Sequence, residues 1–289
     1  MSSIFSRRTI TVIVILALLG WGGYVLYGQF KRAPVVETVQ TPVETIIGKS
    51  VEGREIKAYT YGTGKTHLLF VGGVHGGYEW NSVLLAYNFI DYLNTNISYF
   101  PEFLTVTVIP AVNPDGVYKV IGKEGRFAFA DVATSTSVTG IGRFNSNNVD
   151  LNRNFDCKWK SQSTWKNNIV SAGTKAFSEP EAAALQGFVL KNKPTAVIFW
   201  HSMSNAVYAS ECKNGILPET RNIMNTYAKA AGYPAVDTFD SYEITGDAEG
   251  WLASINIPAI TVELKTHESV EWEKNLAGIK ALFKYYQRP

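Results

Sequence analysis

Charged residues are scarce in this sequence, at 18% of 289 residues, and neither sign of charge is in large excess. Together with a hydrophobic content of 46%, the low charge argues against a disordered chain and predicts one large globular domain. Residues 1–35 contain four basic residues and no acidic one, which leaves 23 basic and 25 acidic residues in the remainder. A domain this close to neutrality lacks the basic surface that nucleic acids require, so we expect no nucleic-acid partner.

The N-terminal segment differs from the rest of the chain. Basic residues flank an apolar run over about residues 9–28, which is long enough to span a bilayer. Bulky residues such as Trp21 occupy its far end, so we favour an uncleaved anchor over a cleaved signal peptide. We predict an anchor over 1–32, a proline-containing linker over 33–44 and a globular domain over 45–289. A single N-terminal span normally exports the large C-terminal part of its chain, so we expect an extracytoplasmic domain, or a secreted one if the segment is cleaved.

Cysteine and histidine are rare, with two and four copies. The spacing of Cys157 and Cys212 does not show that they pair, but an exported domain permits a disulfide. We expect that disulfide in preference to two free thiols. With only four histidines, few imidazoles are available to bind a metal.

Apolar runs and helical patterns alternate along the domain. Runs bounded by turn residues predict buried strands of an α/β sheet over 67–71, 104–112, 196–200 and 259–264. Apolar residues at three- and four-residue spacing predict helices that cover this sheet over 79–93, 179–190, 218–231 and 270–286. Residues 117–150 are irregular and rich in glycine and asparagine, and long irregular segments often carry function.

Two histidines occur where predicted strands end, which is where open α/β sheets bind their ligands. His75 and Glu79 follow the first of these strands, and His201 follows the third. A catalytic zinc needs three ligands of the imidazole or carboxylate type and one open position. Taken alone, each of these histidines is better explained as a loop residue than as a ligand. The other two, His67 and His267, are better explained as surface or capping residues.

Further polar residues need a partner or a role. Asn152 and Arg153 follow the irregular segment, and a guanidinium fork is suited to binding a carboxylate. The alternative is that Arg153 pairs with an internal acid such as Asp150. Glu263 lies within an apolar strand, where burial of an unpaired carboxylate is costly, so a catalytic role or an ion pair would explain it. The Asn-Pro-Asp-Gly sequence at 113–116 is typical of a turn.

Taken together and in this order, these segments resemble the zinc metallocarboxypeptidase family, the carboxypeptidase A-like peptidases, from about residue 46 to the C-terminus. The family's first zinc-binding segment is matched at 75–80, its asparagine-proline turn at 113–116, its substrate-carboxylate pair at Asn152 and Arg153, its third zinc ligand at His201, its mobile-tyrosine segment at 242–251 and its catalytic-glutamate segment at 261–264. The resemblance implies a single α/β domain with a central mixed, largely parallel twisted β-sheet that helices cover on both faces.

The first of these segments departs from the family in its spacing. The family has two residues between its histidine and glutamate, whereas this sequence has a Gly-Gly-Tyr sequence between His75 and Glu79. Either the loop bulges or Glu79 is not the ligand. A four-residue separation still places both side chains on one face if the backbone turns helically. No other carboxylate lies between His75 and Asp91, so we retain Glu79.

The resemblance further implies a peptide hydrolase with one zinc ion. Glu263 would take the proton of the attacking water and pass it to the leaving amine, and Arg143 would stabilise the developing oxyanion. Arg126 is the alternative for this arginine. The zinc ligands implied by the resemblance are His75, Glu79 and His201.

The substrate implied by the resemblance is a peptide with a free C-terminus. Asn152, Arg153 and Tyr242 would hold the terminal carboxylate, which restricts cleavage to the last peptide bond. Glu249 aligns with the position that senses the departing side chain, so its carboxylate predicts a preference for lysine, arginine or diaminopimelate. The alternative for Glu249 is a solvated residue at the start of a helix.

Other functions stay open at this point. The same scaffold and ligands would serve a cell-wall peptide endopeptidase or amidase, or a deacylase, although the carboxylate-binding residues favour a carboxypeptidase. A membrane-tethered protein that binds peptide ends without cleaving them is the alternative outside enzymes, and the presence of Glu263 argues against it. We expect a monomer whose partners are its peptide substrate and the membrane.

Overall fold

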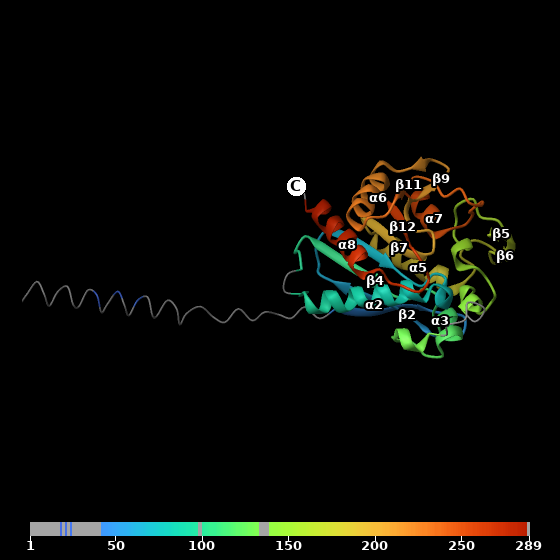
Figure 1. Ribbon diagram of the computed structural model, residues 1–289, viewed down its shortest axis with the longest axis horizontal. Coiled ribbons are helices and arrows are strands. Elements are labelled where there is room, and N and C mark those ends of the chain that lie inside the picture. The colour runs from blue at the N-terminus through green and yellow to red at the C-terminus, as the bar shows by residue number, and fades with distance from the viewer. Residues whose placement is uncertain are drawn as a thin grey trace, which may run out of the picture. The chain divides into compact units, whose positions relative to one another are not determined.

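A computed structural model of the chain describes residues 18, 21, 24, 42–97, 100–132 and 139–287 (Figure 1). The chain divides into two units, Met1–Val39 and Gln40–Pro289, and the sheet and its helices belong to the second. Within the described residues, no helix is both long and apolar enough to cross a membrane. The anchor predicted over 1–32 lies outside the described residues except for Leu18, Trp21 and Tyr24, so it gains no support and stays a prediction.

A mixed sheet of eight strands forms the centre of the second unit, in the order β1-β2-β4-β3-β7-β12-β8-β11. The central strands β4, β3, β7 and β12 are parallel, whereas β1 and β2 add an antiparallel edge and β8 is antiparallel to β12. The sheet strands are β1 (Val43–Lys49), β2 (Glu55–Tyr61), β3 (Thr66–Val71), β4 (Leu104–Ile109), β7 (Ala196–Ser202), β8 (Ala206–Ala209), β11 (Ala235–Val236) and β12 (Ala259–Leu264). Two small hairpins lie outside it, β5 (Gln162–Trp165) with β6 (Asn168–Ser171) and β9 (Glu211–Cys212) with β10 (Gly215–Ile216).

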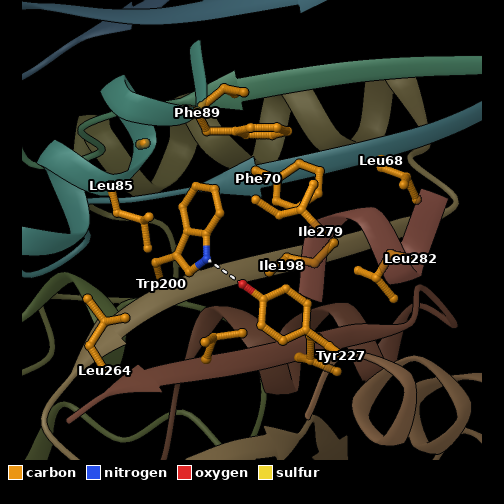
Figure 2. Packing of buried hydrophobic residues seen from close by; sticks show 14 of the residues in the cluster. Leu68, Phe70, Leu85, Phe89, Ile198, Trp200, Tyr227, Leu264, Ile279 and Leu282 are labelled. Carbon is orange, nitrogen blue, oxygen red and sulfur yellow. Dashed lines mark hydrogen bonds between the residues drawn. The ribbon is translucent and has the colours of Figure 1, made fainter. Parts of the chain in front are cut away.

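Helices cover both faces of this sheet (Figure 1). One face packs against α2 (Trp80–Thr95), α6 (Pro218–Ala231) and α8 (Trp272–Tyr286), and the other against α5 (Pro180–Asn192) and α7 (Ala248–Ser254). Successive strand residues point to opposite faces, so Trp200 enters the first core and Phe199 the second. In the first core Trp200 stacks on Phe70, with 5.3 Å between ring centroids, and donates a hydrogen bond to the Tyr227 hydroxyl at 3.3 Å (Figure 2).

All of the predicted strands and helices occur, with bounds that shift by a few residues. β4 ends at Ile109 instead of 112, because Pro110 has no N–H to donate to a neighbouring strand. The turn predicted at 113–116 is the start of helix α3 (Pro114–Ile121), in which Asn113 Oδ1 accepts the Gly116 N–H at 2.8 Å. The first residues of the segment predicted as irregular are therefore helical. β1 begins at Val43, two residues before the predicted domain start.

Candidate metal centre and active site

The candidate site lies at the carboxyl ends of neighbouring parallel strands. β3 is adjacent to β7, and β7 to β12, so the segments that follow them meet at one edge of the sheet. His201 near the end of β7 is paired in register with Glu263 of β12, and His75 follows β3. The strand order thus gathers side chains that are far apart in the sequence.

A tight turn brings His75 and Glu79 together. Residues Gly76–Glu79 form the 3₁₀ helix η1, and α2 begins directly after it. Gly76 has a φ of 47°, and a Cβ there would lie 2.6 Å from the carbonyl oxygen of Gly142, so this position requires glycine. The turn leaves His75 Nδ1 2.8 Å from Glu79 Oε1. The loop therefore takes up its extra residue as a 3₁₀ turn, and both side chains still reach one point.

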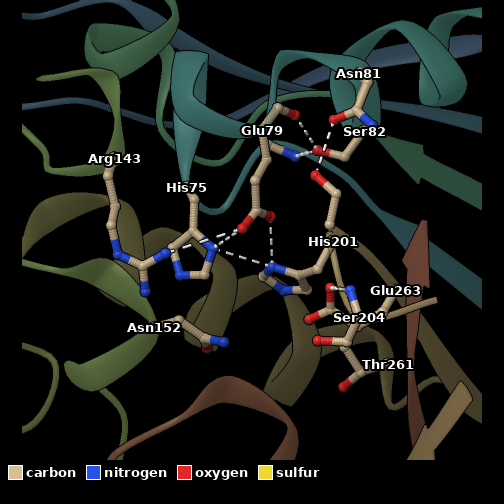
Figure 3. A network of polar contacts seen from close by, with 12 residues as sticks. His75, Glu79, Asn81, Ser82, Arg143, Asn152, His201, Ser204, Thr261 and Glu263 are labelled. Atoms are coloured by element: carbon tan, nitrogen blue, oxygen red, sulfur yellow. Dashed lines mark hydrogen bonds and ion pairs between the residues drawn. The ribbon is translucent and has the colours of Figure 1, made fainter. Parts of the chain in front are cut away.

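His75, Glu79 and His201 are the group of potential metal ligands that the described part of the chain contains. Their ligand atoms lie within 4.8 Å of one another, and all three side chains are buried. His201 Nδ1 lies 2.8 Å from Glu79 Oε2 and 3.1 Å from His75 Nδ1 (Figure 3). Two ring nitrogens this close repel each other unless a proton or a cation lies between them. Two imidazoles and one carboxylate are a known ligand set for catalytic zinc, so these residues fit a zinc ion.

Each of these histidines faces a carboxylate through its other ring nitrogen. His75 Nε2 lies 3.5 Å from Asp150 Oδ1, and His201 Nε2 lies 3.3 Å from Glu249 Oε1. Neither contact has hydrogen-bond geometry, but a carboxylate beside Nε2 favours the tautomer that carries its proton there and leaves Nδ1 free for a metal. Neither contact was predicted, because the sequence suggested other roles for these acids, a partner of Arg153 for Asp150 and a substrate contact for Glu249.

Arg143 reaches the site and Arg126 does not. Two nitrogens of the Arg143 guanidinium contact Asp150 Oδ2, at 2.8 and 2.9 Å, and the group lies 4.4 Å from the Trp165 ring centroid. Burial alone would raise the pKa of Asp150, but the adjacent Arg143 cation is the main reason that this pKa is held well below its usual range. Arg126 instead pairs with exposed Asp91 at 2.9 Å.

Glu263 lines the same cavity as the three potential metal ligands. Burial and the nearby Glu79 carboxylate raise the pKa of Glu263 to about 7, although His201 and the Ser204 N–H, which donates to Oε2 at 3.2 Å, act in the opposite direction (Figure 3). None of the ion pairs between described residues involves Glu263, so an ion pair does not explain its position. A carboxyl group with a pKa near neutrality can accept and return a proton at physiological pH.

The Arg153 guanidinium has no acidic partner among the described residues, although only 2% of the residue is exposed. Its nitrogens donate to the backbone oxygens of Thr164, at 3.1 and 3.3 Å, and of Asn152, at 2.6 Å. Asp150, the alternative partner suggested by the sequence, pairs with Arg143 instead.

The carboxylates of Asp150 and Asp247 interact with the charge of Arg153 from a distance, but only neutral carbonyls contact the guanidinium directly. A buried cation without a direct anionic contact is costly unless an anion binds beside it. Arg153 is therefore a strong indication of an anionic ligand.

The three potential metal ligands line one cavity of ≈ 640 Å³. The same cavity is lined by Arg143, Asn152, Arg153, Tyr242 and Glu263. Its wall carries two acids at the start of α7, Asp247 and Glu249. Burial and the neighbouring Glu249 raise the pKa of Asp247 to about 6. Glu249 is 4% exposed and so is not a solvated helix residue, the alternative that its sequence position allowed.

Cys157 and Cys212 form the expected disulfide, with 6.1 Å between their Cα atoms, and Cys157 lines the cavity.

The two remaining histidines do not join the ligands. His67 in β3 forms a hydrogen bond with the Thr107 hydroxyl at 2.9 Å. His267 packs against Tyr78, with 4.5 Å between ring centroids, and forms a hydrogen bond of 2.6 Å with Ser202. His267 thus lies closer to the site than a surface or capping residue would, through contacts with distant segments that the sequence does not reveal.

The chain is similar in sequence to an endopeptidase and an amidase from bacteria. The chain is 26% identical over 241 residues to gamma-D-glutamyl-L-diamino acid endopeptidase 1 of Lysinibacillus sphaericus, a match that covers 76% of this chain and 60% of that protein. It is 28% identical over 157 residues to murein peptide amidase A of Escherichia coli strain K12, which covers 50% of this chain and 61% of that protein. The chain therefore spans less than two thirds of the length of either relative.

Solved structures share the fold. The structure of bovine thrombin-activatable fibrinolysis inhibitor, in complex with tick carboxypeptidase inhibitor, superposes with a TM-score of 0.67 at 20% identity, over 85% of this chain and 90% of that one. The sequence model of the zinc carboxypeptidase family matches residues 37–286, which is most of the chain. From this match, and from a fold and ligand set that agree with it, the chain belongs to the zinc carboxypeptidase family.

Proposed function

We propose that this protein is a zinc-dependent carboxypeptidase that releases the last residue of a peptide. The observation that carries the proposal is the buried Arg153 guanidinium, which has no acidic partner among the described residues and lines the same cavity as the three ligands. A terminal carboxylate is the anion that such a fork binds through two parallel hydrogen bonds. A peptide held by its terminal carboxylate presents its last peptide bond to the metal centre.

The chemistry divides between the metal and two side chains. A zinc ion at this site would polarise the scissile carbonyl and lower the pKa of a water molecule. Glu263 accepts the proton that the attacking water loses and donates it to the leaving amine. Arg143, which Asp150 holds in place and whose Nη1 lies 3.9 Å from Glu79 Oε1, donates hydrogen bonds to the developing oxyanion.

Three side chains bind the terminal carboxylate in this proposal. The backbone oxygens of Thr164 and Asn152 fix the Arg153 guanidinium, and the Ala248 N–H fixes the Asn152 side chain by donating to its Oδ1 at 2.9 Å. Tyr242 adds a hydroxyl from the cavity wall. Donors that are held before the substrate arrives lose little conformational entropy on binding.

The acidic cavity wall predicts a preference for departing residues that carry an amino or guanidino group. We expect kcat/KM for a peptide ending in lysine or arginine to exceed that for the same peptide ending in phenylalanine by about tenfold, which corresponds to about 1.4 kcal/mol. A peptide ending in glutamate should be the poorest substrate. Asp247→Asn should reduce the preference for lysine and leave the phenylalanine peptide cleaved. A clear preference of the unmodified enzyme for phenylalanine would contradict this role of the wall.

The pKa of Glu263 predicts how activity depends on pH. The carboxylate is the form that accepts a proton, so kcat/KM should fall as the pH falls through this pKa. The protein groups around Glu263 raise its pKa to about 7, and the positive charge of zinc favours the carboxylate, so we expect the acid limb at or below about pH 7. A pH–rate profile at saturating zinc checks this. An acid limb well above pH 7 would show that another group controls it.

A cell-wall peptide amidase or endopeptidase is the second candidate, because the relatives from Escherichia coli and Lysinibacillus sphaericus are named for such activities. The same cavity would take the carboxylate of a diamino acid at Arg153 and its free amino group at the acidic wall. Cleavage of an α-linked glutamyl-lysine peptide and of its γ-D-glutamyl isomer distinguishes the two. Faster cleavage of the α-linked peptide supports the carboxypeptidase, and faster cleavage of the isomer supports the amidase.

We also propose that the enzyme is a monomer that acts outside the cytoplasm, held there by its N-terminal segment. The disulfide between Cys157 and Cys212 supports this location, since such bonds persist in oxidising compartments. Cell fractionation should recover the protein with membranes and accessible to external protease. Recovery in the cytoplasmic fraction would contradict the proposed location, but it would not bear on the proposed carboxypeptidase activity.

A further inference from the structure

Glu249 connects two parts of the candidate site. Its Oε1 lies 3.3 Å from His201 Nε2, and its Oε2 accepts a hydrogen bond from Asn152 Nδ2 at 3.3 Å. The Thr261 hydroxyl also donates to Oε1, at 3.2 Å. With 4% of the residue exposed, both carboxylate oxygens face protein donors. Glu249 is therefore part of the framework of the site as well as part of its wall.

The contact between Glu249 and His201 determines which ring nitrogen of His201 carries the proton and which has a free lone pair. His201 Nε2 is buried and forms no hydrogen bond with a described residue, and Glu249 Oε1 is the acidic oxygen that contacts it, at 3.3 Å. A carboxylate oxygen this close attracts a ring N–H and repels a ring lone pair, so Glu249 favours the tautomer that carries its proton on Nε2. The Nδ1 lone pair then points towards Glu79 and His75, where the metal would bind.

The contact with Asn152 orients a group that binds substrate. The Asn152 amide is held at both ends, since Nδ2 donates to Glu249 and Oδ1 accepts the Ala248 N–H at 2.9 Å. Ala248 and Glu249 are the first residues of α7, and Asp247 caps this helix by accepting the Gly250 N–H at 2.7 Å. The start of one short, capped helix thus fixes the direction of the Asn152 side chain.

We propose that Glu249 is a positioning residue that couples the zinc site to the carboxylate-binding site. Through His201 it orients a metal ligand, and through Asn152 it orients a substrate-binding amide. The inference rests on the proposed metal site, and it extends the role of Glu249 beyond that of an acid that attracts a cationic side chain. It predicts that loss of Glu249 weakens zinc binding before any substrate is present.

Zinc affinity of the purified full-length protein, measured by competition with a chromophoric chelator, tests this coupling. Glu249→Ala should raise the zinc Kd by about 10- to 100-fold, which is the usual effect of removing the partner of a metal-bound histidine. Glu249→Gln should keep most of the affinity, because its amide oxygen can still accept the Nε2 proton. Glu249→Met preserves side-chain volume and replaces the alanine variant if that variant does not fold.

Asp247→Asn is the matched control. It removes a carboxylate from the same cavity wall, keeps a side chain that can cap α7, and has no contact with His201. Its zinc Kd should stay within about twofold of that of the unmodified protein. Equal weakening by Asp247→Asn and Glu249→Ala would show that cavity charge alone is responsible, and it would overturn the positioning role.

A second readout separates positioning from general damage. At saturating zinc, Glu249→Ala should still raise KM for a peptide ending in phenylalanine, because Asn152 loses its partner. Loss of an acid from the wall would by itself favour the apolar phenylalanine side chain and lower this KM. Loss of the Asn152 partner raises the same KM, so the two effects have opposite signs. If Glu249→Ala binds zinc as tightly as the unmodified protein, the coupling is wrong and the proposed function stands. If the unmodified protein binds no zinc, the proposed metal site fails, and with it the proposed function.

Discussion

Replacement of Glu263 by glutamine should lower kcat by about 100- to 10,000-fold, the contribution expected of a positioned general base. Glutamine keeps the length of the side chain and an oxygen that can accept the Ser204 N–H, but it cannot take a proton from water. No side-chain hydrogen bond or ion pair between described residues joins Glu263 to the three potential metal ligands, so zinc should stay bound. Steady-state kinetics together with the zinc content of the purified variant measure both expectations.

The control for this variant is Glu273→Gln, the same substitution at an exposed position of α8. It should leave kcat unchanged, because Glu273 does not line the cavity. Normal turnover by Glu263→Gln would contradict its role as the base. Loss of zinc from Glu263→Gln would show that the residue supports the metal site instead.

Replacement of Arg153 by methionine should lower kcat/KM for peptides with a free C-terminus by roughly 30- to 4,000-fold, corresponding to about 2–5 kcal/mol for one partner of a buried charge pair. Methionine keeps an unbranched stem without the guanidinium. Peptides with an amidated C-terminus offer no carboxylate, so their slow cleavage should be little changed. The ratio of the two kcat/KM values should therefore approach one in the variant. Arg153→Lys keeps the positive charge but not the guanidinium fork. Its kcat/KM for peptides with a free C-terminus should lie between those of the unmodified enzyme and Arg153→Met.

Arg126→Met is the matched control for this second substitution. Arg126 contacts the Tyr87 ring and pairs with Asp91, and it does not line the cavity. Kinetics on both kinds of peptide should match those of the unmodified enzyme. If Arg153→Met still prefers the free carboxylate by the original ratio, another residue binds the terminal group.

The site residues that are easiest to predict from the sequence are those that lie in buried strands or directly after them. β3, β4, β7 and β12 form the buried centre of the sheet and appear in the sequence as nearly continuous apolar runs. His201 and Glu263 stand out because they interrupt or end such runs. β1 and β2 were not predicted, because β1 is mostly exposed and β2 is only partly buried, so neither has a continuous apolar run.

Contacts that depend on three-dimensional approach could be predicted only in part. The sequence keeps Glu79 as a ligand because a helical turn would place it on the same face as His75, and the two side chains do meet. The turn that brings them together, with a positive φ at Gly76 beneath the Gly142 carbonyl, does not show in the spacing. The contacts of Asp150 and Glu249 with the two histidines arise where η5 (Leu151–Arg153) and α7 approach the ends of the strands. The sequence singles out Glu249 for the departing side chain and Asp150 as a possible partner of Arg153, but it does not show that either residue contacts a histidine.

The central claim is that a metal ion at His75, Glu79 and His201 drives removal of single residues from free C-termini. The most direct test incubates the purified protein with a lysine-terminated peptide and with its C-terminal amide, and follows the masses of the products. We expect the free acid to lose one residue at a time, the amide to react far more slowly, a zinc chelator to stop the reaction and added zinc to restore it. Internal fragments, equal cleavage of the amide, or activity that survives the chelator would contradict the claim.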